Sequence, residues 1–229
     1  MARAQASANG AGQTGVKLPS SLYVILDRGA AHGRDLPQLL DAILGGGCRM
    51  VQLREKHMPA AELYPVARAL GERCRRAGAL FIVNDRADLA LAVGADGLHL
   101  GQDDLPAATA RRLLPPGAIL GVSTHDRRQA HHALADGADY IAVGSIFPTG
   151  SKVGFQLVGT QLLATLRPEI PVPLVGIGGI TLDNAEQVIM AGADAVAVIS
   201  AVCAAPDPEA ATRGLMERLE NAQRTRRLN

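Results

Sequence analysis

One arrangement recurs along most of the chain: a short apolar run that ends in polar residues or glycines. Seven such ends follow one another, at Gln52–Lys56, Val83–Arg86, His99–Asp104, Gly121–His125, Phe147–Lys152, Gly176–Ile180 and Val198–Ser200. An ordinary globular domain would scatter such groups. Their regular series predicts a closed barrel of parallel strands, because the carboxyl ends of those strands gather at one mouth, where functional residues collect.

The apolar runs themselves predict eight strands, at Leu22–Leu26, Met50–Leu53, Leu80–Val83, Gly97–Leu100, Ile119–Val122, Tyr140–Val143, Pro173–Ile177 and Ala195–Ile199. The runs are continuous rather than alternating, which is typical of parallel strands buried on both faces. Helical patterns lie between them, and Asp35 and Asp207 are the expected N-caps of the first and last helix. Pro65 lies inside the second helical pattern, Ala60–Arg76, and is expected to kink it.

A weak internal repeat supports this count of units. The triplet Gly-Ala-Asp occurs at 94–96, 137–139 and 192–194, each time between a helical pattern and a strand. The glycine is expected to end the helix, and the aspartate to make the turn into the strand. Repeated β-α units indicate one α/β domain, a (β/α)₈ TIM barrel over residues 18–225. Residues 1–17 are expected to form a flexible tail and residues 226–229 a frayed C-terminus.

Composition narrows the classes of partner. The 23 basic and 22 acidic residues leave a net charge of +1, which argues against binding to nucleic acid or to an anionic membrane. The apolar stretch Ala195–Ala205 is shorter than the roughly 18 residues of a membrane span. Cys48, Cys74 and Cys203 form no Cys-x-x-Cys pair, which fits a reducing compartment, so a cytoplasmic location is expected. The sequence does not specify an oligomeric state.

Two cations follow the second strand. Arg54 and Lys56 lie on the same side of the strand as Gln52, because successive side chains alternate between faces. A solvated run of charges is the more ordinary interpretation of such a segment taken alone. Its position at the carboxyl end of a barrel strand favours a binding role, and a guanidinium beside an ammonium suits a phosphate or pyrophosphate.

Acidic residues follow the third and fourth strands. Asp85 and the pair Asp103-Asp104 stand at strand ends that are about 5 Å apart in a barrel, so two carboxylates can converge on one cation. Mg²⁺ commonly takes one or two carboxylates and completes its shell with water and phosphate oxygens. The alternative is that each aspartate caps the helix that follows it.

The remaining strand ends predict a second anion site. Ser123 has no evident carboxylate partner for a catalytic triad, so it is expected to donate a hydrogen bond to a ligand, while His125 opens a helix. The loop from Thr149 to Lys152 suits an anion, although a plain Gly/Ser turn is the competing interpretation. Gly178-Gly179 and Ile199-Ser200 follow the seventh and eighth strands, where such barrels bind phosphate.

Two anion sites across one mouth indicate two phosphorylated small-molecule substrates. The cations and the metal would neutralise a departing pyrophosphate, so transfer of an organic group with loss of pyrophosphate is the expected reaction class. The other histidines show no metal-ligand spacing, which argues against zinc.

At these residues the chain resembles the thiamine phosphate synthase (thiamine-phosphate pyrophosphorylase) family. The similarity is collinear from about Leu22 to Ala204 through QLREK, VNDRADLA, GADGLHLGQDD, GVSTH, FPTGSK, VGIGGIT and AVIS. The resemblance implies a magnesium-dependent transferase. The family joins 4-amino-2-methyl-5-hydroxymethylpyrimidine pyrophosphate to 4-methyl-5-hydroxyethylthiazole phosphate, giving thiamine monophosphate and pyrophosphate by a dissociative mechanism.

The resemblance also implies roles for individual residues. Asp85 and Asp104, rather than Asp103, would be the magnesium ligands. The pyrimidine pyrophosphate would be bound by Gln52, Leu53, Arg54, Glu55, Lys56, Asn84, Ser123 and Lys152. Of these, Arg54, Lys56, Ser123 and Lys152 would be catalytic. The thiazole phosphate would be bound by Thr149, Gly150, Ser151, Gly179, Ile199 and Ser200.

Two other functions are compatible with the same barrel. Thiazole tautomerases share part of the motif set but need no paired aspartates, and this chain keeps both Asp85 and Asp104. A non-catalytic ligand-sensing barrel would be expected to lose its cations, whereas Arg54, Lys56 and Lys152 are all present. The basic doublets, such as Arg111-Arg112, lie on helical patterns and are interpreted as solvated faces rather than as a nucleic-acid site.

Overall fold

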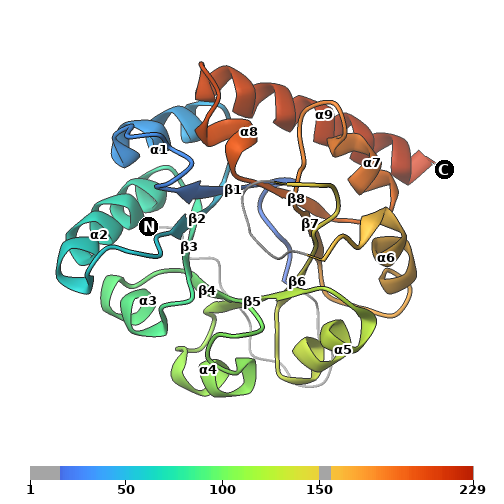
Figure 1. The fold of residues 1–229 in the computed structure, drawn as a ribbon, viewed down its shortest axis with the longest axis horizontal. Coiled ribbons are helices and arrows are strands. Elements are labelled where there is room, and N and C mark those ends of the chain that lie inside the picture. The colour runs from blue at the N-terminus through green and yellow to red at the C-terminus, as the bar shows by residue number, and fades with distance from the viewer. Residues whose placement is uncertain (1–15, 150–155, 229) are drawn as a thin grey trace.

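A computed structural model describes residues 16–149 and 156–228, and within them the chain forms a closed parallel barrel surrounded by helices (Figure 1). The strands are β1 Leu22–Asp27, β2 Met50–Arg54, β3 Leu80–Asn84, β4 Gly97–Leu100, β5 Ile119–Thr124, β6 Tyr140–Val143, β7 Leu174–Ile177 and β8 Ala195–Val198. Each strand pairs in parallel with the next, and β8 pairs with β1. The predicted single-domain (β/α)₈ TIM barrel is confirmed.

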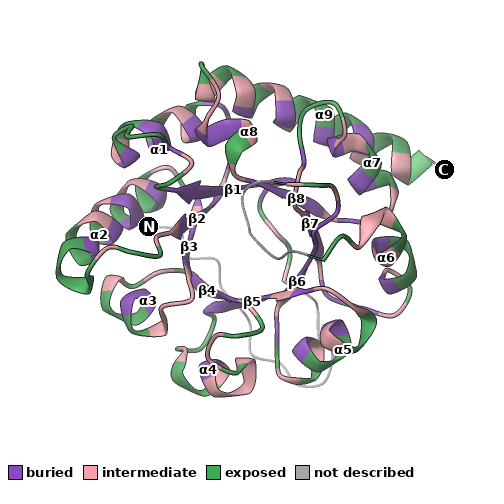
Figure 2. Ribbon diagram, in the orientation of Figure 1, coloured by how far each residue is buried: buried purple, intermediate pink, exposed green. Residues whose placement is uncertain are grey.

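The helices of the described residues form the outer ring. They are α1 Leu36–Gly45, α2 Ala60–Arg76, α3 Ala87–Val93, α4 Ala107–Leu113, α5 Arg127–Ala135, α6 Gly159–Leu166, α7 Ala185–Met190, α8 Ser200–Cys203 and α9 Pro208–Leu228. Their inward faces and the strands are buried, and their outward faces are exposed (Figure 2). No helix among the described residues has the length and apolar character of a membrane span.

Local sequence signals account for the helix ends. The Asp35 carboxylate accepts a hydrogen bond from the Gln38 N–H at 3.1 Å, and Asp207 accepts one from Ala210 at 3.0 Å, so both predicted caps are confirmed. The expected kink at Pro65 does not break the segment, since α2 is one helix from Ala60 to Arg76.

The structure describes part of each chain end. Residues 1–15 of the predicted tail lie outside the described residues, and Val16 packs against the apolar cluster inside the barrel. Arg226–Leu228 belong to α9, and fraying of residues 226–229 stays a prediction. The Arg226 guanidinium donates to the Ile189 carbonyl at 2.8 Å, which ties this last turn to α7.

Two apolar layers hold the barrel together. The larger lies between strands and helices, and the smaller fills the barrel interior with side chains such as Tyr23, Met50, Ile82 and Tyr140. Inward residues at the strand ends lie above this interior plug. The barrel therefore presents its polar strand ends at one mouth.

Candidate active site

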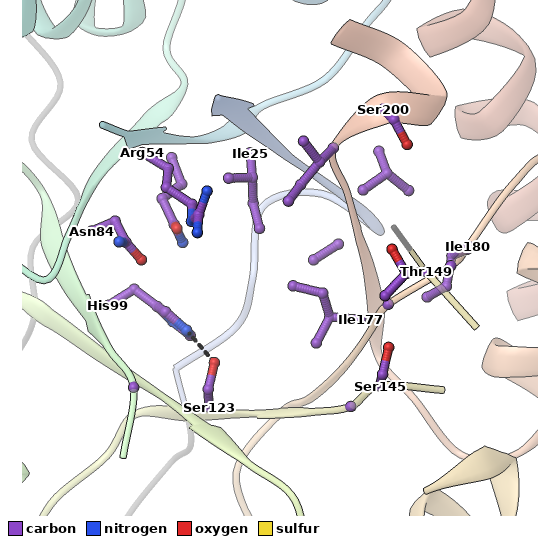
Figure 3. A pocket seen from close by; sticks show the side chains of 18 of the residues that line it. Ile25, Arg54, Asn84, His99, Ser123, Ser145, Thr149, Ile177, Ile180 and Ser200 are labelled. Atoms are coloured by element: carbon purple, nitrogen blue, oxygen red, sulfur yellow. Dashed lines mark hydrogen bonds between the residues drawn. The ribbon is translucent and has the colours of Figure 1, made fainter. Parts of the chain in front are cut away.

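A cavity of about 670 Å³ opens at the carboxyl ends of the strands. Figure 3 shows Arg54, Asn84, His99 and Ser123 on one side of it, and Thr149, Ile180 and Ser200 on the other. The side chains of Ile25 and Ile177 lie between the two groups. The cavity therefore has two polar sides separated by an apolar strip.

The predicted cations reach this cavity from the end of β2. Gln52, Arg54 and Lys56 all line it, as alternation along the strand requires. Arg54 forms an ion pair with Asp27, its register partner on β1, and Lys56 forms one with Asp85 after β3. Both cations are thus oriented by a carboxylate on a neighbouring strand end.

Two other residues of this segment point elsewhere. Leu53 belongs to the core between strands and helices. The Glu55 carboxylate accepts the His57 and Met58 N–H groups at 2.8 and 3.2 Å, so it shapes the turn after Lys56. The structure does not bring the Leu53 and Glu55 side chains into the cavity, in contrast to the expected substrate contacts.

The two predicted metal ligands meet. Asp85 and Asp104 line the cavity, and their carboxyl groups hydrogen-bond to each other. Burial and this hydrogen bond raise the pKa of Asp85, against the effect of Lys56. The pKa of Asp104 is lowered in spite of burial, because Asp85 and the Gly101 N–H hydrogen-bond to it. The two carboxyl groups therefore lie close enough to interact directly at the mouth of the barrel.

The alternative interpretation of these aspartates as helix caps is wrong. No side chain caps α3 or α4, whose N-cap residues are Arg86 and Pro106. Asp104 instead accepts the Gly101 N–H at 2.7 Å. Asp85 has φ of +61°, a left-handed conformation that aspartate tolerates better than most residues. This backbone conformation turns Asp85 toward the cavity rather than along α3.

Ser123 and His125 both reach the cavity from β5 and the residue after it. The Ser123 hydroxyl lies 2.8 Å from His99 Nε2. His125 does not open a helix, because α5 begins at Arg127 with Asp126 as its cap. Its Nδ1 lies 2.5 Å from the Gly144 carbonyl, which fixes the imidazole at the rim.

The other polar side is built by the ends of β6, β7 and β8. Thr149, Gly179, Ile199 and Ser200 line the cavity as predicted. The predicted residues Gly150, Ser151 and Lys152 lie outside the described residues. An α-helix leaves its first N–H groups without intrahelical partners, so Ser200 stands where backbone amides can receive an anion.

Several lining residues were not predicted to bind anything. His99 and Ser145 line the cavity. Asp27 does not line it, but it forms the ion pair that orients Arg54. Alternation along β4 was the available signal for His99, since Leu98 and Leu100 flank it and belong to the outer core. The pairing of Asp27 with Arg54 depends on the register of β1 and β2, which composition does not encode.

Comparisons with known proteins point to one family. The family described as "Thiamine monophosphate synthase" matches residues 22–202. The chain is 52% identical over 203 residues to the thiamine-phosphate synthase of Moorella thermoacetica, covering 88% of this chain and 97% of that one. It is 50% identical to the thiamine-phosphate synthase of Roseiflexus sp. over 195 residues, covering 85% and 83%.

A solved structure shows the same architecture. The thiamine phosphate pyrophosphorylase from Pyrococcus furiosus superposes with a TM-score of 0.82 at 38% identity, covering 88% of this chain and 96% of that one. The matched residues include every strand of the barrel and the described residues that line its mouth. The chain belongs to the thiamine monophosphate synthase family and is an enzyme of thiamine biosynthesis.

Proposed function

We propose that this enzyme joins 4-amino-2-methyl-5-hydroxymethylpyrimidine pyrophosphate to 4-methyl-5-hydroxyethylthiazole phosphate, with Mg²⁺ as its cofactor. The products are thiamine monophosphate and pyrophosphate. The observation that carries the proposal is the pairing of Asp85 with Asp104 beside Lys56, across one cavity from Gly179 and Ser200. Two anion-binding sides in one cavity suit two phosphorylated substrates.

The residues present fit a magnesium ion. Among residues 16–149 and 156–228, no group of three or more His, Cys, Asp or Glu could hold a metal. A site here would rely on only two carboxylates: Asp85 and Asp104 would hold the ion together with water and pyrophosphate oxygens, which is the usual composition of a magnesium shell. The donor set supports this fit, since Asp85 and Asp104 bring two carboxylates together at one edge of the cavity, and Mg²⁺ prefers such oxygen ligands. When bound, Mg²⁺ would supply positive charge to the pyrophosphate.

The chemistry assigned to the chain is stabilisation of a leaving group. The bond between the pyrimidine methylene carbon and the pyrophosphate oxygen breaks, and its electron pair leaves with pyrophosphate. Arg54 and Lys56 lie where they can hydrogen-bond to that oxygen cluster and neutralise its charge, and Lys152 is assigned the same role. The thiazole nitrogen then forms the new C–N bond with the methylene carbon.

The thiazole phosphate is assigned to the opposite side of the cavity. Thr149, Gly179 and Ser200 line that side, and Gly150 and Ser151 are assigned to it as well. Ile25 and Ile177 lie between the two polar sides and offer an apolar surface to the two rings. This arrangement would bring the thiazole nitrogen toward the pyrimidine methylene group.

The direct test is to mix the purified protein with both substrates and Mg²⁺, and to measure release of pyrophosphate and formation of thiamine monophosphate. We expect turnover with the complete mixture and its loss when EDTA removes the metal. No turnover of the pair, combined with isomerisation of a thiazole phosphate alone, would instead identify a thiazole tautomerase. Binding of both compounds without any conversion would identify a ligand-sensing barrel.

Substitution of the paired aspartates tests the metal assignment. Asp85→Asn or Asp104→Asn should reduce magnesium-dependent turnover by about 100-fold, because each removes one anionic ligand but keeps the size of the side chain. Asp103→Asn is the matched control, since Asp103 borders the same cavity and is not an assigned ligand. Its turnover should change only a few-fold. Full turnover of both the Asp85 and the Asp104 variants would exclude this metal site.

A further inference from the structure

A chain of buried hydrogen bonds crosses the barrel interior beneath the cavity. The Gln52 Nε2 donates to the Tyr23 hydroxyl at 2.5 Å, and that hydroxyl lies 3.0 Å from the Tyr140 hydroxyl. The Tyr140 hydroxyl lies 2.8 Å from His99 Nδ1, and His99 Nε2 lies 2.8 Å from the Ser123 hydroxyl. Five side chains on β1, β2, β4, β5 and β6 are thus connected from the core to the mouth.

These side chains are held with little freedom. Gln52, Tyr23 and Tyr140 are no more than 1% exposed, and His99 is 5% exposed. The Tyr140 ring stacks on His99 at 5.6 Å and meets Tyr23 edge to face at 6.0 Å. Burial raises the pKa of both phenols well above the usual value, so each hydroxyl keeps its hydrogen. Each phenol hydroxyl can therefore donate one hydrogen bond within this series of hydrogen bonds.

The amide nitrogen of Gln52 sets the direction of the bonds, because it can only donate. Tyr23 accepts that bond, so its own hydrogen goes to Tyr140. Tyr140 accepts from Tyr23, so its hydrogen goes to His99 Nδ1, which must then be unprotonated. The hydrogen of a neutral imidazole is consequently on Nε2, and it points at the Ser123 oxygen.

We infer that this directed chain holds the Ser123 hydroxyl as a hydrogen-bond donor to the substrate, and that Tyr140 and His99 are positioning residues for it. Ser123 accepts from His99, so its own hydrogen is available to an acceptor in the cavity. With the opposite direction, Ser123 would donate into the barrel and present only lone pairs to the ligand. The inference deepens the proposed function, and on that function the acceptor is a group of the pyrimidine pyrophosphate.

The first test reads the tautomer of His99 without any turnover. Long-range ¹H–¹⁵N correlation NMR of the ¹⁵N-histidine-labelled full chain distinguishes protonated from unprotonated ring nitrogens, and the spectrum of His99→Asn assigns the signals. We expect hydrogen on Nε2 and none on Nδ1. A hydrogen on Nδ1, or on both nitrogens, would overturn the inferred direction.

The second test is a double-mutant cycle measured with both substrates and Mg²⁺. Tyr140→Phe should lower kcat about tenfold, with an unchanged KM for the thiazole phosphate, because it removes the donor that fixes His99. In a Ser123→Ala background the same substitution should have no further effect on kcat, since the chain acts through Ser123. Multiplicative losses would show that Tyr140 acts independently of Ser123 and would overturn the inference.

Tyr64→Phe is the matched control for the loss of a phenol hydroxyl. Tyr64 lies on the outer ring, is 42% exposed and belongs to α2, away from the cavity. It should leave kcat and the His99 spectrum unchanged. The two tests separate this inference from the proposed function: an inactive wild type with hydrogen on Nε2 contradicts the function alone, whereas turnover with hydrogen on Nδ1 contradicts the directed chain alone.

Discussion

At the residue scale, Gly178 shows how closely two loops of the mouth approach each other. It adopts φ of +102°, and a Cβ atom there would lie 2.0 Å from the Ser145 hydroxyl oxygen and 2.7 Å from the Ser145 Cα. The loop after β7 can therefore contact the segment after β6 only with glycine at this position. Gly178 thus helps to set the shape of the mouth.

Gly178→Ala should consequently destabilise the protein by more than the backbone strain of a positive φ accounts for. The left-handed conformation costs roughly 1–2 kcal/mol and the clash roughly 1–3 kcal/mol more. Gly33→Ala is the control, because Gly33 has φ of +80° and a Cβ atom added there would meet nothing within 4 Å. Urea unfolding measures both free energies, and equal losses for the two variants would show that the contact with Ser145 has no energetic weight.

At the scale of elements, the Gly-Ala-Asp joints do more than turn the chain. Gly94, Gly137 and Gly192 have positive φ, as helix ends with glycine require. Each aspartate then clamps two strands, since its N–H donates to the preceding strand and its carboxylate accepts an N–H from the same residue. The clamped residues are Phe81 for Asp96, Leu120 for Asp139 and Leu174 for Asp194.

Substitution of two of these aspartates should separate the clamp from its ion pairs. Asp194 also accepts from Arg167 at 2.6 Å, whereas Asp96 forms no ion pair within the described part of the chain. We expect Asp194→Asn to lower the free energy of unfolding by about 2–3 kcal/mol and Asp96→Asn to lower it by about 1 kcal/mol. The difference arises because only Asp194 also loses a charge-assisted hydrogen bond, from Arg167. Guanidinium unfolding provides the comparison; a larger loss for Asp96→Asn would contradict this ranking.

The sequence predicted the positions of the strands more accurately than the contacts between them. The apolar runs located the eight strands to within one or two residues, because parallel strands are buried on both faces. The joints were recognised as turns, but their bonds to Phe81, Leu120 and Leu174 follow from strand pairing across about 15 to 20 residues of sequence. The anchoring of Arg226 on α7 is likewise a contact between distant segments.

The same limit applies to the candidate site. The sequence could place five residues at the mouth because each lies at, or shortly after, the carboxyl end of a strand: Gln52, Arg54, Lys56, Asp85 and Asp104. The Leu53 side chain points away from the cavity because residues alternate along the strand, and the Glu55 side chain does so because it bonds within the turn. Treating QLREK as one binding motif overlooked both. The link from His99 to Tyr140 joins two strands that are not neighbours, so only the closed barrel brings those side chains together.

At the scale of the whole molecule, the three cysteines are free and buried. Burial raises the pKa of Cys48 and Cys203 to about 11 and that of Cys74 to about 12, from 9.0. A raised pKa in the folded state favours the protonated thiol. Its contribution to stability is therefore complete below pH 9 and is lost as the pH rises through 11.

The free energy of unfolding should consequently fall at alkaline pH, by up to about 1.4 kcal/mol per pH unit for each thiol above its unfolded pKa. Urea titrations at a series of pH values measure the slope. Cys48→Ala should make it shallower, because one titrating group is gone. An identical slope in this variant would assign the alkaline loss to the buried phenols instead.

The Asp96, Asp139 and Asp194 clamps sit at the amino ends of their strands, on the rim opposite the opening. The contacts that hold neighbouring strands together and the residues of the candidate active site therefore lie at opposite ends of the barrel. Residues around the opening that make no close backbone contact like that of Gly178 can therefore be exchanged with little effect on strand pairing at the opposite rim, so substrate preference can be altered there at small cost to folding.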